Sequence, residues 1–120
     1  MERTSFIKGT ALTAVLLGLA FWGPGSAADV DGKKVFDKKC ASCHGKDGAG
    51  NPKMLKMTKA TIEELGLTDP DTLKKTDKEL AAIIADGVKG KKMAAWGKKL
   101  KAEEIDALVK YIRSLPAKKN

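Results

Sequence analysis

Both cysteines and the only histidine of the chain lie within the five residues Cys40 to His44, which read CASCH. Thiol and imidazole groups are ligands for transition metals and iron cofactors. Four kinds of site use such a stretch: a redox-active disulfide, a structural zinc site, a plain disulfide and a covalently attached c-type haem. The sequence therefore indicates one chemical centre at this point of the chain.

The rest of the sequence favours the haem. A redox disulfide is expected beside a βαβ pattern, and no strand-rich stretch is present. A structural zinc site takes four ligands, usually in two separated pairs, but this chain has no second cysteine pair and no second histidine. A plain disulfide does not need an adjacent histidine.

Haem attachment accounts for all three side chains at their observed spacing. In Cys-x-x-Cys-His the two thiols form thioethers with the haem vinyl groups, and the histidine becomes the proximal iron ligand. The tether and the ligand can reach the same haem face because they share one helical turn. We therefore predict one covalent haem c, bound through Cys40, Cys43 and His44.

The second axial ligand of the iron decides between electron transfer and ligand binding. A methionine thioether closes that position and raises the redox potential, whereas an open iron binds gases or peroxide. Met54 and Met57 follow His44 by only 10 and 13 residues, which leaves little chain to reach the other haem face. Met93 follows it by 49 residues, in a glycine-containing segment, and is the predicted distal ligand. Without that bond the chain would be a five-coordinate haem sensor or a weak peroxidase.

The first 28 residues have the pattern of a secretory signal peptide. Arg3 and Lys8 precede an apolar run over residues 10–22, and small residues follow a Gly-Pro-Gly break. Because a spanning helix needs about 20 residues, we predict cleavage after Ala28 and not an uncleaved membrane anchor. The mature domain would be residues 29–120, exported to a bacterial periplasm.

The net charge of +8 comes from 23 basic and 15 acidic residues, and loss of residues 1–28 would leave about +7. A set of lysines flanks Met93: Lys89, Lys91, Lys92, Lys98 and Lys99. These basic side chains would attract acidic docking sites on redox proteins, such as a reductase or a terminal oxidase. Nucleic-acid binding is disfavoured because the basic residues are dispersed along an exported chain. We expect a monomer that is not inserted in the membrane after cleavage.

Apolar periodicity predicts a small all-α domain of about three to five short helices around the haem. Capping and breaking residues set the expected ends, with a Thr-x-x-Glu capping box at Thr76 and a stop at Gly87. Asp69-Pro70 is expected to be a turn, and Lys101 is a weak cap for the last helix. The predicted helices cover residues 31–39, 58–65, 77–86 and 102–114, and residues 45–52 form a loop.

With these features in order, the chain resembles the class I, or monohaem, bacterial cytochromes c over nearly all of residues 29–115. The resemblance rests on the haem tether, on Met93 with Trp96-Gly97 after it, and on the closing helix EEIDALVKYIRSL. It implies a one-electron carrier that is not an enzyme by itself. It also implies that Gly32 and Phe36 of the first helix pack across the last helix near Tyr111.

The resemblance implies two further roles. The carbonyl of Pro52 would accept a hydrogen bond from the proximal histidine, unless Pro52 is an ordinary loop proline. Trp96 would lie in the haem pocket near a propionate, unless it is a core residue. One departure is Ala94, because the family typically has proline after the distal methionine, so the loop is expected to be less rigid. A dedicated electron-transfer subunit of a periplasmic oxidoreductase would share this chemistry and differ only in its partner.

Overall fold

The computed structural model describes residues 29–117. The predicted signal peptide, residues 1–28, lies outside these residues, so its cleavage stays a prediction. The described part is helical and has no strand, which confirms the all-α fold. Its helices are α1 (Gly32–Lys39), α2 (Ala41–His44), the 3-10 helix η1 (Pro52–Met54), α3 (Leu55–Thr58), α4 (Ile62–Leu65), α5 (Pro70–Lys74), α6 (Asp77–Asp86) and α7 (Ala102–Ser114). Within residues 29–117, no helix has both the length and the apolar character needed to cross a bilayer.

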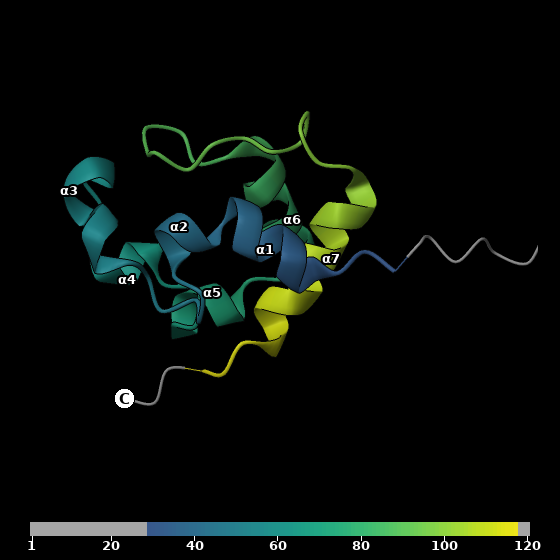
Figure 1. The fold of residues 1–120 in the computed structure, drawn as a ribbon, viewed down its shortest axis with the longest axis horizontal. Helices are drawn as coiled ribbons and strands as arrows, with labels where there is room; N and C mark the ends of the chain where they lie inside the picture. The colour runs from purple at the N-terminus through teal and green to yellow at the C-terminus, as the bar shows by residue number, and fades with distance from the viewer. Residues whose placement is uncertain (1–28, 118–120) are drawn as a thin grey trace, which may run out of the picture.

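The first and last helices cross in close contact (Figure 1). At the crossing, a Cβ atom on Gly32 would lie 2.1 Å from the carbonyl oxygen of Ala107, so only glycine fits there. One turn later Phe36 is fully buried, and its ring centroid lies 5.1 Å from that of Tyr111 at an interplanar angle of 56°. This tilted arrangement is favourable for aromatic pairs. The predicted packing of Gly32 and Phe36 against the last helix is confirmed.

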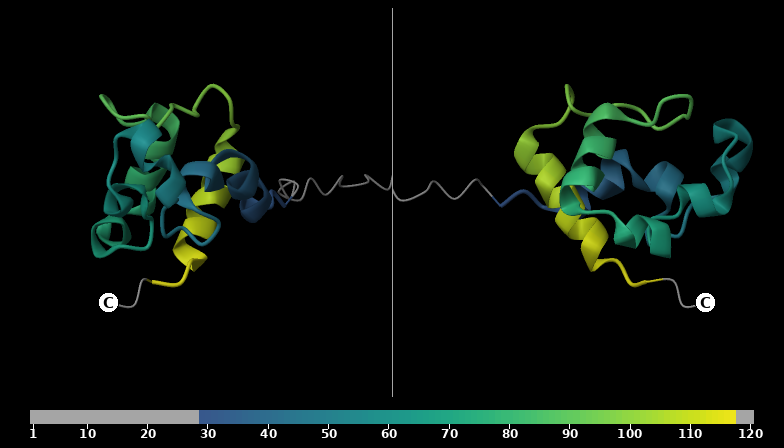
Figure 2. Two further views of the ribbon diagram at one scale, coloured as in Figure 1. Left: turned by 60° about the vertical axis from the view of Figure 1, so that its left-hand side comes forward. Right: turned by 180° about the vertical axis from the view of Figure 1, so that it is seen from behind.

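The hydrophobic core lies where α6 and α1 meet α7, and Figure 2 shows α6 beside α7 from behind. Its buried members are Phe36, Ala41, Leu80, Ile84, Leu100, Ile105, Leu108, Val109 and Ile112. Arg113 extends the contact beyond the core, because its guanidinium donates to the Asp77 carboxylate (2.8 Å) and to the carbonyls of Leu73 (3.0 Å) and Lys75. The long helices therefore form one packed unit.

Two of the predicted helices have the predicted ends. The capping box at the start of α6 is present, with the Thr76 hydroxyl accepting from the amide of Glu79, and Gly87 follows the helix at φ 71°. Helix α7 covers the predicted residues 102–114. Its Lys101 has no side-chain acceptor to offer, but the Glu104 carboxylate accepts the Lys101 amide at 2.8 Å. The start of α7 thus has half of a capping box.

Two local predictions were wrong. Residues 58–65 do not form one helix, because Lys59 has a left-handed conformation (φ 54°) and Thr61 begins α4 with its own capping box. Asp69-Pro70 is not a plain turn: Asp69 is the N-cap of α5, and its carboxylate accepts the amides of Asp71 and Thr72. Proline at the first helical position fits the fixed φ of that residue. The described chain therefore has three helices of eight or more residues, α1, α6 and α7, and four shorter α-helices.

Candidate cofactor site

The two cysteines lie on one turn, where α1 passes into α2. The carbonyl of Cys40 accepts the amides of Cys43 (3.2 Å) and His44 (3.0 Å), so the three side chains are held together by the helix itself. Both thiols are free and half-buried. Burial, assisted by the neighbouring Cys43, raises the pKa of the Cys40 thiol to about 11. Redox-active cysteines have a lowered thiol pKa, so the environment of Cys40 does not suit a redox disulfide.

A glycine-rich loop folds back on α2 after His44. The carbonyl of His44 accepts the amide of Gly50 at 2.7 Å, and the carbonyl of Gly48 accepts the amide of Leu67 at 2.7 Å. Gly48 and Gly50 have φ values of 74° and 90°, which side-chain-bearing residues rarely adopt. A Cβ on Gly50 would also lie 2.9 Å from Ile62. These contacts place α4 beside α2.

As a result, the His44 ring faces a carbonyl that is 21 positions away in the sequence. Nδ1 of His44 lies 2.8 Å from the carbonyl oxygen of Leu65. Because a carbonyl only accepts, Nδ1 carries the proton and donates it, and Nε2 keeps its lone pair. Burial lowers the pKa of His44 below its usual 6.5, and the hydrogen bond to Leu65 opposes that shift only in part. The imidazole is therefore neutral and oriented, as an iron ligand must be.

The predicted partner of this nitrogen, the Pro52 carbonyl, was wrong. Pro52 is exposed and opens η1, while Leu65, at the end of α4, supplies the acceptor. The reason is the fold-back of the glycine loop, which brings α4 and not η1 next to the ring. The capping box at Thr61 was a sequence signal for α4, but nothing local identified the carbonyl that His44 would face.

Met93 lies in the segment between α6 and α7, which runs along one side of α1 and α2 (Figure 1). Gly87 allows the close approach that starts this segment, because a Cβ there would lie 2.6 Å from the Met93 carbonyl oxygen. That oxygen accepts the amide of Val88 at 3.2 Å. The exit is fixed to α6 by the amide of Trp96, which donates to the Ile84 carbonyl at 3.0 Å. Met93 itself is half-buried.

Trp96 is half-buried and packs against the hydrophobic core. Two ammonium groups lie near its ring, that of Lys99 at 5.3 Å and that of Lys39 at 5.9 Å from the ring centroid. Both distances are within the range of cation–π attraction. The predicted proximity of Trp96 to a haem propionate stays a prediction.

The chemistry of these residues fits a haem. Cys40 and Cys43 offer two free thiols on one turn, His44 offers an oriented Nε2, and Met93 offers a thioether from a separate segment. By contrast, residues 29–117 contain no group of three or more histidine, cysteine or carboxylate side chains arranged to hold a metal ion. A four-ligand zinc site would need such a group.

Several known proteins are similar to this chain over most of its length. Residues 30–116 match the family model described as Cytochrome c. The chain is 38% identical over 107 residues to cytochrome c6 of Nostoc sp., with 82% of this chain and 86% of the relative covered. It is 34% identical over 102 residues to cytochrome c-553 of Helicobacter pylori, with 84% and 94% covered. Among solved structures, the KustC0563 c-type cytochrome has a TM-score of 0.59 at 28% identity, covering 72% of this chain and 98% of that one.

Proposed function

Because the chain belongs to the cytochrome c family and carries one covalently attached haem c, we propose that it is a soluble periplasmic one-electron carrier with iron ligated by His44 and Met93. The observation that carries this proposal is the hydrogen bond from His44 Nδ1 to the Leu65 carbonyl, at 2.8 Å. It fixes the tautomer in which Nε2 is the ligand, and it strengthens the imidazole as a donor to iron.

Each residue of the site has a separate task. Cys40 and Cys43 hold the haem covalently through thioethers, so the cofactor is not lost on dilution. His44 and Met93 would both bind the iron, so no coordination position would remain for a substrate. The haem supplies a reversible one-electron change at iron, and the polypeptide controls its burial, its potential and its access to partners.

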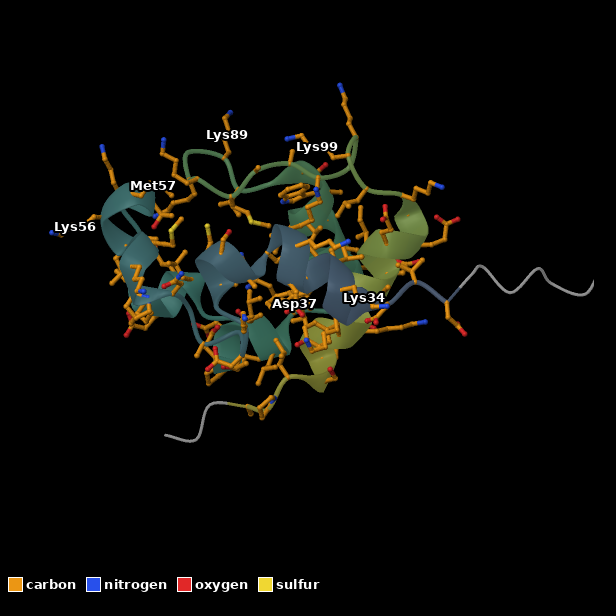
Figure 3. The ribbon with its side chains drawn as sticks, viewed as in Figure 1. Lys34, Asp37, Lys56, Met57, Lys89 and Lys99 are labelled. Carbon is orange, nitrogen blue, oxygen red and sulfur yellow. The ribbon has the colours of Figure 1, made fainter. Side chains whose placement is uncertain are left out.

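The lysines around the Met93 segment provide the docking surface. Lys91 is engaged by Glu64 at 2.7 Å, whereas four others are exposed and have no ion pair within the described chain: Lys89, Lys92, Lys98 and Lys99. Figure 3 shows Lys89 and Lys99 along this side of the molecule, and Lys39 joins Lys99 at the Trp96 ring. We define these five free lysines, Lys39 included, as the basic rim. It would steer the acidic docking site of a reductase or an oxidase into short-lived contact.

The test of the ligand set is the visible spectrum of the oxidised and reduced protein. We expect a sharp reduced α-band, and a weak far-red thioether-to-iron band in the oxidised form. Met93→Ala should remove the far-red band, and the matched control Met57→Ala should keep it. A high-spin spectrum, or immediate reaction with carbon monoxide in the unmodified protein, would instead indicate an open iron and a sensor or peroxidase.

The docking proposal is tested by the rate of electron transfer to an acidic redox partner at rising ionic strength. The rate should fall as salt screens the attraction, because exposed charges interact over about 10 Å at 0.1 M salt. A rate that does not depend on salt would contradict the basic rim. Co-purification with a stable partner would favour the subunit of a larger oxidoreductase.

A further inference from the structure

One ion pair joins the Met93 segment to a distant helix. The Lys91 ammonium lies 2.7 Å from Oε1 of Glu64, on α4, although the two residues are 27 positions apart. Within the described chain, the other hydrogen bonds of residues 88–95 stay inside that segment, such as Val88 to Met93 and Lys91 to Val88. The Glu64–Lys91 pair is therefore the polar link between residues 88–95 and the rest of the fold, because the main-chain bonds back to α6 begin only at Trp96 and Gly97.

The side chain of Glu64 is held in place by hydrogen bonds that do not involve Lys91. Its Oε2 accepts the amide of Thr61 at 2.9 Å, and the Thr61 hydroxyl accepts the amide of Glu64 at 3.2 Å, which is the capping box of α4. One carboxylate oxygen of Glu64 thus caps the start of α4, and the other forms the ion pair with Lys91. Because the carboxylate is already ordered, forming the pair costs less side-chain entropy than at an unrestrained surface residue.

The same short helix serves the proximal side of the site. Leu65 follows Glu64 directly, and its carbonyl oxygen accepts a hydrogen bond from His44 Nδ1 at 2.8 Å. Lys91 precedes Met93 by two residues, and Ala94 follows it without the stiffness of proline. Helix α4 therefore contacts the proximal ligand through its main chain and the distal segment through a side chain.

From this arrangement we infer that Glu64 and Lys91 form a clasp that holds the Met93 segment closed, which makes both of them positioning residues for the distal ligand. The inference rests on the proposed ligation by Met93. The side chains of Glu64 and Lys91 are 43% and 50% exposed, so the clasp is a surface ion pair. It raises the fraction of molecules in which the Met93 segment is closed, and it does not lock the segment. Pairs of this kind change an equilibrium by about two- to fivefold.

The test is the displacement of Met93 by imidazole in the oxidised holoprotein at neutral pH, followed through the far-red band. Glu64→Gln should raise the apparent imidazole affinity about two- to fivefold, because glutamine keeps the capping box but not the charge. Lys91→Gln should raise the imidazole affinity by the same factor. The double variant should bind imidazole no more tightly than either single variant, because one ion pair is lost in all three. Lys91→Arg should restore the unmodified behaviour. Lys92→Gln is the matched control, since it removes a charge from the same segment without breaking an ion pair of the described chain.

Salt gives a second check. At 1 M salt the screening length is about 3 Å, so the difference between Glu64→Gln and the unmodified protein should largely disappear. Unchanged imidazole affinity in both single variants would overturn the clasp, as would strictly additive effects or an equal effect of Lys92→Gln.

Amide hydrogen exchange of residues 88–95 gives a readout that does not depend on the iron. Both single variants should speed this exchange, while Lys92→Gln should leave it as it is. An unmodified protein that lacks the far-red band would contradict ligation by Met93, and the exchange rates would still decide whether Glu64 and Lys91 hold the segment. Failure of the clasp and failure of the proposed function are therefore distinguishable.

Discussion

The half of the molecule built from α1, α6 and α7 differs from the half built from residues 45–75 in what holds it together. Of the eleven buried apolar side chains in residues 29–117, the first half contains seven, among them the fully buried Phe36 and Leu108. In residues 45–75 the only buried apolar side chain is Leu65, accompanied by the buried hydroxyl residues Thr58 and Thr68. One half thus packs on itself, and the other depends on turns, caps and hydrogen bonds.

This difference indicates where the cofactor contributes to the fold. The polar half leaves Met57 63% exposed on α3, which Figure 3 shows at one end of the molecule. A small domain has too little apolar surface for a large core and commonly depends on a cofactor or a covalent link. We therefore expect the haem to stabilise residues 45–75 far more than it stabilises the α1–α7 crossing.

The largest expected effect comes from removing the haem attachment. In Cys40→Ser/Cys43→Ser no thioether can form. Residues 45–75 should then lose their hydrogen-exchange protection, with a local opening free energy of about zero. Residues of α6 and α7 should keep measurable protection. Hydrogen exchange with mass spectrometry compares the two halves in one experiment, with Ser42→Ala as the control within the tether. An equal loss of protection in residues 45–75 and in α6 and α7 would contradict the view that the haem mainly stabilises residues 45–75.

A packing change at the crossing should come next. Gly32→Ala places a Cβ 2.1 Å from the Ala107 carbonyl oxygen, so the helices must separate, at a cost of about 2–3 kcal/mol in the free energy of unfolding. Gly90→Ala is the matched control, because Gly90 has φ 78° but no atom within 4 Å of the added carbon, and only backbone strain of about 1 kcal/mol remains. Urea unfolding of the holoproteins measures both, and similar losses would show that packing at the crossing is not decisive.

The two capping boxes allow the same change to be made in each half. Thr76→Ala, at the start of α6, should lower the free energy of unfolding by about 1 kcal/mol. Thr61→Ala, at the start of the four-residue α4, should lower it by only a few tenths of that, because α4 can open locally without global unfolding. Its effect should appear instead as faster amide exchange in residues 62–65. Equal global losses would mean that the two halves unfold as one unit.

The smallest expected effect is a pH dependence at Asp69, the N-cap of α5. Partial burial tends to raise the pKa of this carboxyl, but hydrogen bonds from Thr72 and Asp71 outweigh it and hold the pKa below its usual 3.8. The native state therefore binds fewer protons than the unfolded state near that pH. The resulting stabilisation is fully present above 3.8 and is lost as the pH falls through the native pKa. Asp69→Asn keeps the cap and should flatten this part of the acid-unfolding curve, and a curve identical to that of the unmodified protein would contradict the assignment.

The parts that could be predicted from the sequence are those with local signals. The spacing of Ile105, Leu108, Val109 and Ile112 predicted α7 because four buried positions repeat with the helical period. The tether was predicted because its three side chains are adjacent in the chain. These signals need no knowledge of distant contacts.

The parts that could not be predicted depend on contacts between distant segments. The Leu65 carbonyl was missed because the glycine loop, and not the sequence near His44, determines what faces the ring. The break at Lys59 and the start of α5 at Pro70 were missed because helices of four or five residues have too little periodicity to be recognised. In both cases a capping residue, Thr61 for α4 and Asp69 for α5, is the local sequence signal that marks the start of the short helix.

The crossing of α1 and α7 also determines the order in which the domain can be completed. It joins the first helix of the described chain to the last, and every proposed haem ligand, from Cys40 to Met93, lies between them. A nascent chain that has reached Lys101 therefore has all of its ligands but not the helix on which Gly32 and Phe36 pack. Contacts between such distant segments carry an entropic cost, because a long loop must close to bring them together. A chain truncated just before α7 should therefore keep all four proposed ligands but lack the apolar face on which α1 and α6 pack.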